Sequence, residues 1–423
     1  MDKELKQNTT PKKSNAFLLL SNILTVLLVW RSNYSTSQFF VAYFTSIIYI
    51  ALFLVWFLIA CNIDSTFLTR VVKNSWTLLI FLFVNIFLDL INYTQIRLEQ
   101  VNCLIALFMY CIFIFYKDRK DCNKFKKFIL WVILIDFLIK ILYSIQQISI
   151  NPAIIKQMST EGASDSREVS ILIADYSTVY ACVMISVFLM GLFKKLESKA
   201  WRIATVVTIV ILVYFIFICS FFMALLLLVY GVVSLFFKEK KYYYVVVPLV
   251  VLFVVLILRQ PLSSFCAFMS KQDFWSAIIQ GKWDDMSKLL AYGSDHAYMS
   301  DMRLDLMKKS LTIFSDYPFF GIYSMNTKLK IGGHSGWLDG LANYGIFRYS
   351  FFVAFLVMLF KNTCNHSAYK TPIFSTISVY ALLSIVNPNV FPQVWIIFSV
   401  LIPFYCDLAK SKGSIKGGRL LQK

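Results

Sequence analysis

The sequence predicts an all-α polytopic membrane protein with about twelve transmembrane helices. The chain has 423 residues and is 59% hydrophobic, and its mean hydropathy is +0.68. Soluble domains have only about 45–50% apolar residues. Apolar runs of roughly 20 residues, the length that crosses a bilayer, recur along almost the whole chain. Lysine and arginine gather in alternate connections between these runs, as expected where cationic loops stay in the cytoplasm.

The apolar runs locate the expected spans. We place them at residues 16–30, 38–61, 76–92, 101–116, 128–146, 169–193, 201–218, 221–237, 242–258, 338–360, 372–386 and 391–408. The first run follows the polar start "MDKELKQNTTPKKSN" and carries no small-residue cleavage site. We therefore expect it to be a membrane helix and not a removed signal peptide.

The cations set the expected orientation. By our count, 26 lysines and arginines fall in connections on one side, against 4 in the short connections on the other side: Arg31, Arg97, Lys156 and Arg167. Short cationic loops resist translocation, so we expect both termini in the cytoplasm. The formal net charge of +18 then reflects inner loops, and it does not call for a nucleic-acid partner.

The spans divide the chain into three parts. Residues 1–258 contain spans one to nine, residues 259–337 form one large extracytoplasmic loop, and residues 338–423 contain the last three spans and a basic cytoplasmic tail. Connections far longer than about 12–15 residues are usually functional. We therefore expect the substrate site to involve this loop.

The middle of the large loop, "SDMRLDLMKKSLTIFSDYPFFG", predicts an amphipathic helix. Ser300 is its candidate N-cap. Spacings of three and four residues indicate an apolar stripe of Leu304, Met307, Leu311 and Phe314. We expect the apolar side of this helix to lie on the outer membrane surface.

The stretch "IGGHSG" directly precedes the tenth span and contains one of only three histidines. Ser335 is a plausible N-cap, which puts His334 at the positive end of a long helix. The helix dipole there disfavours imidazolium, so a neutral ring could accept a proton. The amides of Gly332 and Gly333 could form a nest for a phosphate oxygen. The alternative is a simple turn before a helix, with an interfacial histidine.

Five ionisable residues fall at membrane depth, where charges are costly and usually functional: Asp89, Asp136, Lys140, Asp175 and Arg348. Asp136 and Lys140 are spaced to pair on one helix face, which favours structural neutralisation. Asp89 and Asp175 lie toward the outer halves of their spans. Arg348 is expected either to line a polar cavity under the loop or to pair with an aspartate.

Sequence motifs for metals and nucleotides are absent. There is no CxxC or HExxH motif, no acidic metal loop, and no Walker or GxGxxG motif. The sequence therefore predicts no metal site and no cofactor.

Three features in a fixed order carry a family resemblance. An arginine, Arg303, opens the loop helix; the turn Pro318-Phe319-Phe320-Gly321 follows; and "HSGWLDGLANYG" runs from His334 to Gly345. With the order of spans around the long loop, this pattern resembles the O-antigen polymerase and ligase superfamily of bacterial membrane glycosyltransferases, which includes the Wzy-type polymerases.

The resemblance implies a GT-C-like fold and a multi-pass transferase of the bacterial cytoplasmic (inner) membrane. Its substrates would be oligosaccharide repeat units on undecaprenyl pyrophosphate. At the outer face, these would be polymerised into O-antigen, capsular polysaccharide or exopolysaccharide. No sugar nucleotide and no metal are expected in this family. The expected partners are the lipid-linked glycans and membrane lipid, and a chain-length regulator is a further candidate.

The resemblance also assigns roles. Arg303 would hold the leaving pyrophosphate, because a guanidinium matches phosphate oxygens in bidentate fashion. His334 would accept the proton of the attacking hydroxyl. The family often has a serine–arginine pair before the loop. Here Ser220 fits but Phe221 stands in the arginine's place, so another cation would have to substitute.

Further residues are candidates for substrate binding. Arg259 and Arg348 are the candidate substitutes for the missing arginine, and Ser335 stands where the family usually has asparagine. The remaining candidates lie in the loop or at the start of the tenth span: Gly332, Gly333, Asp339, Asp295 and His296.

Other functions remain open at this point. A ligase of the same superfamily would move finished glycan to a different acceptor. A flippase or secondary transporter should show paired broken helices or repeat symmetry, and the sequence indicates neither. A structural or regulatory membrane protein is the remaining alternative.

Overall fold

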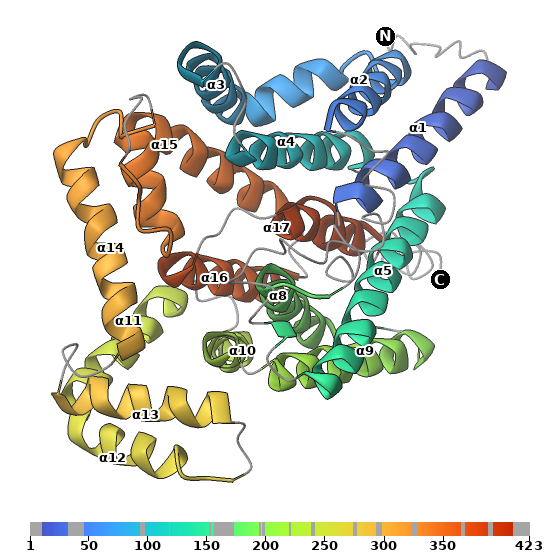
Figure 1. Ribbon diagram of the computed structural model, residues 1–423. Helices are drawn as coiled ribbons and strands as arrows, with labels where there is room; N and C mark the ends of the chain where they lie inside the picture. Colours follow the sequence, from blue (N-terminus) through green and yellow to red (C-terminus); the bar gives the residue numbers. More distant parts are fainter. Residues whose placement is uncertain are drawn as a thin grey trace.

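The computed structural model describes residues 11–32, 46–93, 98–117, 119–151, 154–155, 173–193, 196, 199–219, 221–237, 242–273, 277–292, 298–323, 329–364, 369–387 and 392–408. Every regular element within these residues is a helix (Figure 1). The predicted all-α class is therefore confirmed for the part of the chain that is described.

The helices follow one another closely along the chain. The N-terminal part contains α1 (Pro11–Ser32), α2 (Ser46–Ile63), α3 (Phe67–Tyr93), α4 (Leu98–Tyr116) and α5 (Asn123–Ile150). The middle contains α8 (Tyr176–Phe193), α9 (Lys199–Ile218), α10 (Phe222–Ser234) with the short η2 (Leu235–Phe237), and α11 (Tyr243–Ile257). The rest contains α12 (Arg259–Met269), α13 (Ala277–Tyr292), α14 (Tyr298–Asp316), α15 (Gly336–Thr363), α16 (Lys370–Val386), α17 (Pro392–Ile396) and η5 (Ile397–Leu401).

Six of the described helices are long and apolar enough to cross a membrane, or seven if α11 and α12, which meet at an 89° bend, form one span. Five shorter apolar helices accompany them: Ile48–Ile63, Cys103–Tyr116, Phe222–Phe237, Lys370–Val386 and Pro392–Leu408. With α11 included, each of the twelve ranges expected from the apolar runs contains one of these apolar helices, and six of the ranges contain a helix long enough to cross a membrane. This is the architecture of a helical membrane protein.

Helix α8 is the most deeply packed of the long apolar helices, with 78% of its residues buried. It contacts α9, α10 and α16, and it lies near the middle of the molecule (Figure 1). In α9, by contrast, only 22% of the apolar segment is buried. The apolar side chains that α9 exposes, such as Val207 and Val210, would contact lipid in a bilayer.

The expected large loop is more ordered than the sequence indicated. Two helices that were not predicted, α12 and α13, lie side by side at one end of the molecule, and α14 runs from them back toward α15 (Figure 1). The predicted loop helix is present as α14. It begins by Tyr298, so the expectation that Ser300 is its N-cap was wrong.

The buried face of α14 also differs from the predicted apolar stripe. Ser310 is fully buried and Ile313 is buried, whereas Leu304 and Leu311 are exposed. The helix packs on α15 through Ile313, which joins a small core with Ala342. The buried face of α14 is therefore rotated from the apolar stripe, because it includes a serine that the hydrophobic pattern does not register.

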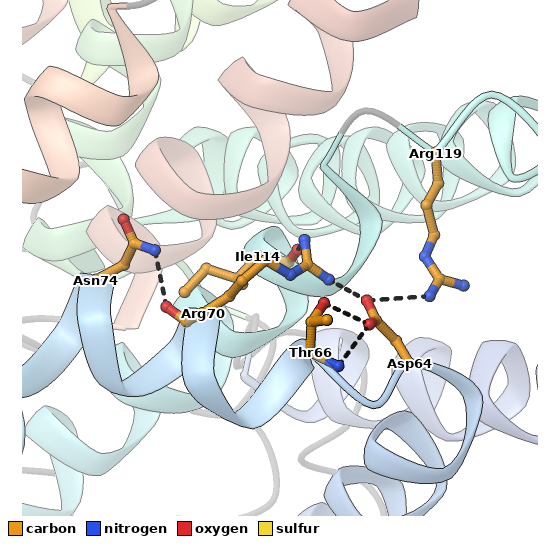
Figure 2. Close-up of polar contacts among 6 residues, drawn as sticks. All are labelled: Asp64, Thr66, Arg70, Asn74, Ile114 and Arg119. Carbon is orange, nitrogen blue, oxygen red and sulfur yellow. Dashed lines mark hydrogen bonds and ion pairs between the residues drawn. The ribbon is translucent and has the colours of Figure 1, made fainter. Parts of the chain in front are cut away.

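A polar cluster fastens the α2–α3 turn to the connection after α4 (Figure 2). Asp64 accepts hydrogen bonds from the amide and the hydroxyl of Thr66, at 3.0 and 2.7 Å. Arg70 forms an ion pair with Asp64 and donates to the carbonyl of Ile114 at 3.1 Å. Arg119 approaches Asp64 to 3.5 Å. Burial alone would raise the pKa of Asp64, but the Thr66 hydrogen bonds and the two guanidinium groups outweigh it and lower this pKa.

A second ion pair joins two helices far apart in the sequence. Lys126 Nζ of α5 lies 2.9 Å from Asp407 Oδ2, and both side chains are buried. The cation count places the start of α5 and the end of the last span on the cytoplasmic side. Both segments of the Asp64 cluster are expected there too, so these long-range contacts agree with the expectation that the joined segments share one side of the membrane.

Candidate functional site

The segment before α15 is shaped by its glycines and by the first turn of the helix. Ser335 has extended backbone angles, and its hydroxyl accepts from the Leu338 amide at 3.3 Å. The predicted N-cap is therefore confirmed. His334 directly precedes this cap and is partly buried, at the end of α15 where the helix dipole is positive.

The carboxylate of Asp339, in the first turn of α15, accepts hydrogen bonds from the segment that precedes the helix. Its Oδ1 accepts from the Gly333 amide at 3.2 Å, and its Oδ2 accepts from the Ser335 amide at 2.9 Å. The carboxylate thus holds the peptide groups of the two residues that flank His334. Of the two amides expected to form a phosphate nest, those of Gly332 and Gly333, the Gly333 amide already donates to the chain's own carboxylate.

Ser310 connects α14 to the same segment. Its hydroxyl donates to Asp339 Oδ1 at 2.6 Å and accepts from the Gly332 amide at 2.9 Å. A Cβ on Gly332 would lie 2.0 Å from the Leu306 carbonyl oxygen. Glycine is required at position 332 because the segment packs directly on the backbone of α14.

Arg303 belongs to α14, seven residues before Ser310. Positions seven apart share one face of an α-helix, about 10 Å apart along its axis. The side chain of Arg303 lies outside the described residues, as do Asp295 and His296. The described backbone therefore brings the helix that carries Arg303 against the segment that carries His334.

The α15 end also rests on α16 and α8. The Gly336 amide donates to the carbonyl of Asn387 at 3.0 Å, and the Asn387 side chain donates to the Tyr180 hydroxyl at 3.1 Å. The Trp337 indole donates to the Ala381 carbonyl at 3.1 Å. Asn387 was not among the expected site residues. It lies next to Pro388 at the end of an apolar run, where it has the appearance of a turn residue.

The turn Pro318–Tyr323 docks into a break in α15. Gly345 has non-helical angles of φ 65° and ψ 171°, so the expected continuous span at 338–360 is interrupted. Four backbone hydrogen bonds join the two segments, which we call the clasp (residues 318–323 and 342–347). They run from Ile322 to Ala342 (3.0 Å), Tyr323 to Asn343 (2.8 Å), Ile346 to Pro318 (2.8 Å) and Phe347 to Phe319 (3.2 Å).

Two glycines make the clasp possible. Gly321 and Gly345 have φ angles of 61° and 65°, which L side chains rarely adopt. A Cβ on Gly321 would lie 2.3 Å from the Asn343 carbonyl oxygen, and one on Gly345 would lie 2.3 Å from that of Phe319. The glycines of the two sequence motifs therefore serve close backbone packing here.

Arg348 closes the clasp. Its guanidinium donates to Asn85 Oδ1 at 2.9 Å and, through Nε, to the Tyr344 carbonyl at 3.2 Å. Nη2 also donates to the carbonyls of Phe320 and, at 3.4 Å, Asn343. The Asn343 carbonyl also accepts from the Tyr323 amide. The guanidinium therefore supplements the backbone hydrogen bonds at the break, where unpaired polar groups are costly at membrane depth. Arg348 is only 3% exposed, and its guanidinium donates both to backbone carbonyls and to the Asn85 side chain.

Helix α3 supports the clasp from the other side. Asn85 and Asp89 are four residues apart on this helix and are both fully buried. The Tyr323 hydroxyl donates to Asp89 Oδ2 at 2.9 Å. The Tyr323 ring centroid lies 5.6 Å from the guanidinium carbon of Arg348. Tyr323 thus contacts both the buried carboxylate and the buried guanidinium.

Two other expected residues have different surroundings. Arg259 opens α12, is exposed, and donates through Nε to the Leu290 carbonyl of α13. Asp175 lies just before α8 and not inside a span, and it accepts from the amide and the hydroxyl of Thr178 at 2.9 and 2.6 Å. Lys140 of α5 interacts electrostatically with Asp175, which the spacing of Asp136 and Lys140 did not indicate.

Ser310, Asn85 and Tyr323 contribute to this region and were not anticipated. Ser310 and Asn85 interrupt otherwise apolar helix faces, which is a weak signal for a buried polar contact. Within the described part of the chain, no group of three or more histidine, cysteine, aspartate or glutamate residues could hold a metal ion.

No protein-family model and no curated protein sequence matches the chain.

Proposed function

We propose that this protein polymerises undecaprenyl-pyrophosphate-linked oligosaccharide repeat units at the outer face of the bacterial cytoplasmic membrane. One observation carries the proposal. The hydrogen bond between Ser310 and Asp339 joins the helix that contains Arg303 to the segment that contains His334. The two residues expected to carry the chemistry therefore come from elements packed against each other, and not from separate parts of the bundle.

The chemistry needs a cation and a proton acceptor. The acceptor sugar's hydroxyl oxygen forms a bond to the donor's anomeric carbon while the bond from that carbon to the pyrophosphate oxygen breaks. Arg303 neutralises the charge that develops on the leaving pyrophosphate. His334 takes the hydroxyl proton. Undecaprenyl pyrophosphate leaves.

A second phosphate contact would come from Arg259 in preference to Arg348. The Arg348 guanidinium is buried and bonded to Asn85 and to clasp carbonyls, so a phosphate would reach it only if the clasp opened. Arg259 is exposed and opens α12 at the end of α11, in the segment expected outside the membrane.

The break in α15 and the 89° bend where α11 meets α12 are the observations that favour a transporter. Transporters use unwound carbonyls at broken helices to bind ions. Here, however, the carbonyls of Asn343 and Tyr344 accept from the Arg348 guanidinium. A bound cation would have to compete with this guanidinium for the carbonyl oxygens. The break in α15 therefore favours a structural role over a cation-binding site. A ligase differs from a polymerase in its acceptor, which the products of the reaction would reveal.

Substitutions at Arg303 and His334 test the proposal. His334→Ala should lower the rate by roughly 10²–10⁴-fold by removing the general base. Arg303→Lys should rescue poorly, since an ammonium group cannot reproduce the bidentate contact. The measurements are polymer length on a gel and the amount of protein in membranes. Lys308→Ala is the matched control, because Lys308 lies on the same helix with its side chain 71% exposed.

The outcomes separate the functions. Arg303 or His334 variants that accumulate single repeat units, with normal amounts of protein in the membrane, support the polymerase. The Lys308→Ala control should make polymer of normal length. Normal polymer from both Arg303→Ala and His334→Ala would end the catalytic assignment. Wild-type transfer of a finished glycan to an acceptor other than a lipid-linked repeat unit would support the ligase.

A further inference from the structure

We propose that Asp339 and Ser310 are positioning residues: they fix the backbone on both sides of His334 and tie it to α14. The sequence placed Asp339 among the substrate-binding groups. The effect of this positioning on the reaction rate rests on the polymerase function proposed above, whereas the positioning itself rests on the hydrogen bonds alone.

The geometry supports positioning because the carboxylate contacts both neighbours of His334. The Gly333 and Ser335 amides donate to different oxygens of Asp339, at 3.2 and 2.9 Å. With two peptide groups held in this way, the intervening residue has little freedom to rotate its backbone. The Ser310 hydroxyl adds a third donor at 2.6 Å, and this donor comes from another helix.

The same contacts argue against substrate binding by Asp339. Both of its oxygens already accept hydrogen bonds within the chain, and the residue is buried. A carboxylate would also repel a pyrophosphate. In the first turn of α15, its charge is instead stabilised by the helix dipole and by amide donors.

Ser310 extends the positioning to the second expected catalytic element. Its hydroxyl both donates to Asp339 and accepts from the Gly332 amide at 2.9 Å. Any rotation of α14 about its axis would break these bonds together. The distance between the backbones that carry Arg303 and His334 is therefore set in part by this serine.

A double-mutant cycle tests whether Asp339 acts through His334. The probe is the purified lipid-linked repeat unit, and the full-length protein is assayed in nanodiscs. We expect Asp339→Asn to lower kcat by about 10²-fold with little change in KM, because a displacement of about 1 Å has that effect. In the double variant, Asp339→Asn should not slow His334→Ala further. The matched control is Asp316→Asn, an exposed aspartate at the end of α14.

Hydrogen exchange gives a readout that does not need activity. In Asp339→Asn, the amides of Gly333 and Ser335 should exchange about tenfold faster or more, because the side chain keeps only one acceptor oxygen and loses its charge. In Ser310→Ala, the Gly332 amide should exchange faster by a similar factor, because its acceptor is removed. Ser315→Ala is the matched control. Ser315 lies on α14, is exposed, and donates to the Leu311 carbonyl of its own helix.

The two readouts keep the two proposals apart. If the wild type does not extend the probe, the polymerase function fails, and unchanged exchange in both variants would then overturn the positioning as well. If the wild type is active, additive effects in the cycle would overturn positioning through His334 and favour direct substrate binding by Asp339. Non-additive rates with faster local exchange support the inference.

Discussion

At the scale of single residues, short polar and small side chains do most of the organising around His334. Asp339 and Ser310 replace water as partners for three backbone amides. Gly332 permits contact with α14, and Gly333 turns the chain with a φ of 79°. Each of these residues acts through the backbone. Substitutions should therefore change the conformation of residues 332–335 first, and should change the reaction rate only through that conformation.

The adjacent glycines should respond differently to alanine. Gly333→Ala adds a Cβ in open space, so only its positive φ is unfavourable, at about 1–2 kcal/mol. Gly332→Ala places a Cβ against the Leu306 carbonyl oxygen and should displace the segment from α14. We expect a larger loss of polymer and faster hydrogen exchange at residues 332–335 for Gly332→Ala. The reverse order would contradict the packing.

Asp64 should make stability depend on pH. Its pKa is lowered in the folded protein, so its stabilisation is complete above its unfolded value of about 3.9 and is lost as pH falls through the lower folded value. Asp64→Asn should lower the free energy of unfolding by about 1 kcal/mol or less near pH 7, because the site is partly solvated. Thermal unfolding of both proteins between pH 7 and pH 3 should show the difference shrinking below about pH 4. A constant difference would contradict the ion pairs.

At the scale of elements, α15 is two helical segments joined by the clasp. A break at membrane depth exposes backbone groups, and each must find a partner within the protein. The turn Pro318–Tyr323 supplies amides and carbonyls, Arg348 supplies further donors, and α3 holds the arginine through Asn85. The clasp therefore couples α3, the end of the large loop and α15.

Arg348→Met should weaken this joint. It removes a buried guanidinium from several neutral acceptors, and each buried polar group left without a partner costs about 1–3 kcal/mol. Arg348→Lys should be intermediate, because an ammonium cannot reach the same set of carbonyls. Thermal unfolding in detergent measures the effect. Arg202→Met, which removes an exposed arginine, is the control, and equal stability of the two methionine variants would argue against the clasp.

At the scale of the whole molecule, the long-range polar contacts agree with the charge asymmetry. The Asp64 cluster (Figure 2) and the Lys126–Asp407 pair join segments that the cation count assigns to the cytoplasmic side. The α12–α13 pair lies at one end of the molecule (Figure 1), in the part expected outside the membrane.

Cysteine labelling tests this topology. A Lys288→Cys variant should react with an impermeant reagent in intact cells, since α13 is expected outside. Lys288 is a better position than Lys282, because its side chain is 48% exposed against 26%. The partly exposed Cys61 and Cys364 should first be replaced by serine. If Lys288→Cys reacted only after permeabilisation, the expected topology would be wrong. Lys361→Cys, which is expected in the cytoplasm, is the control and should react only after permeabilisation.

The sequence by itself determined the helical class, the positions of the apolar helices and the Ser335 cap. These depend on local composition, on apolar length and on neighbours three or four residues apart. It also indicated Arg303 by a resemblance, and His334 both by a resemblance and by its place at the start of a long helix. Only the tertiary structure decided that α15 breaks at Gly345, that Arg348 binds carbonyls, and that Asp339 accepts from Ser310. The physical reason is sequence separation. Asp339 and Ser310 are 29 residues apart, and Arg348 and Asn85 are 263 apart, so no local pattern specifies which buried polar group meets which partner.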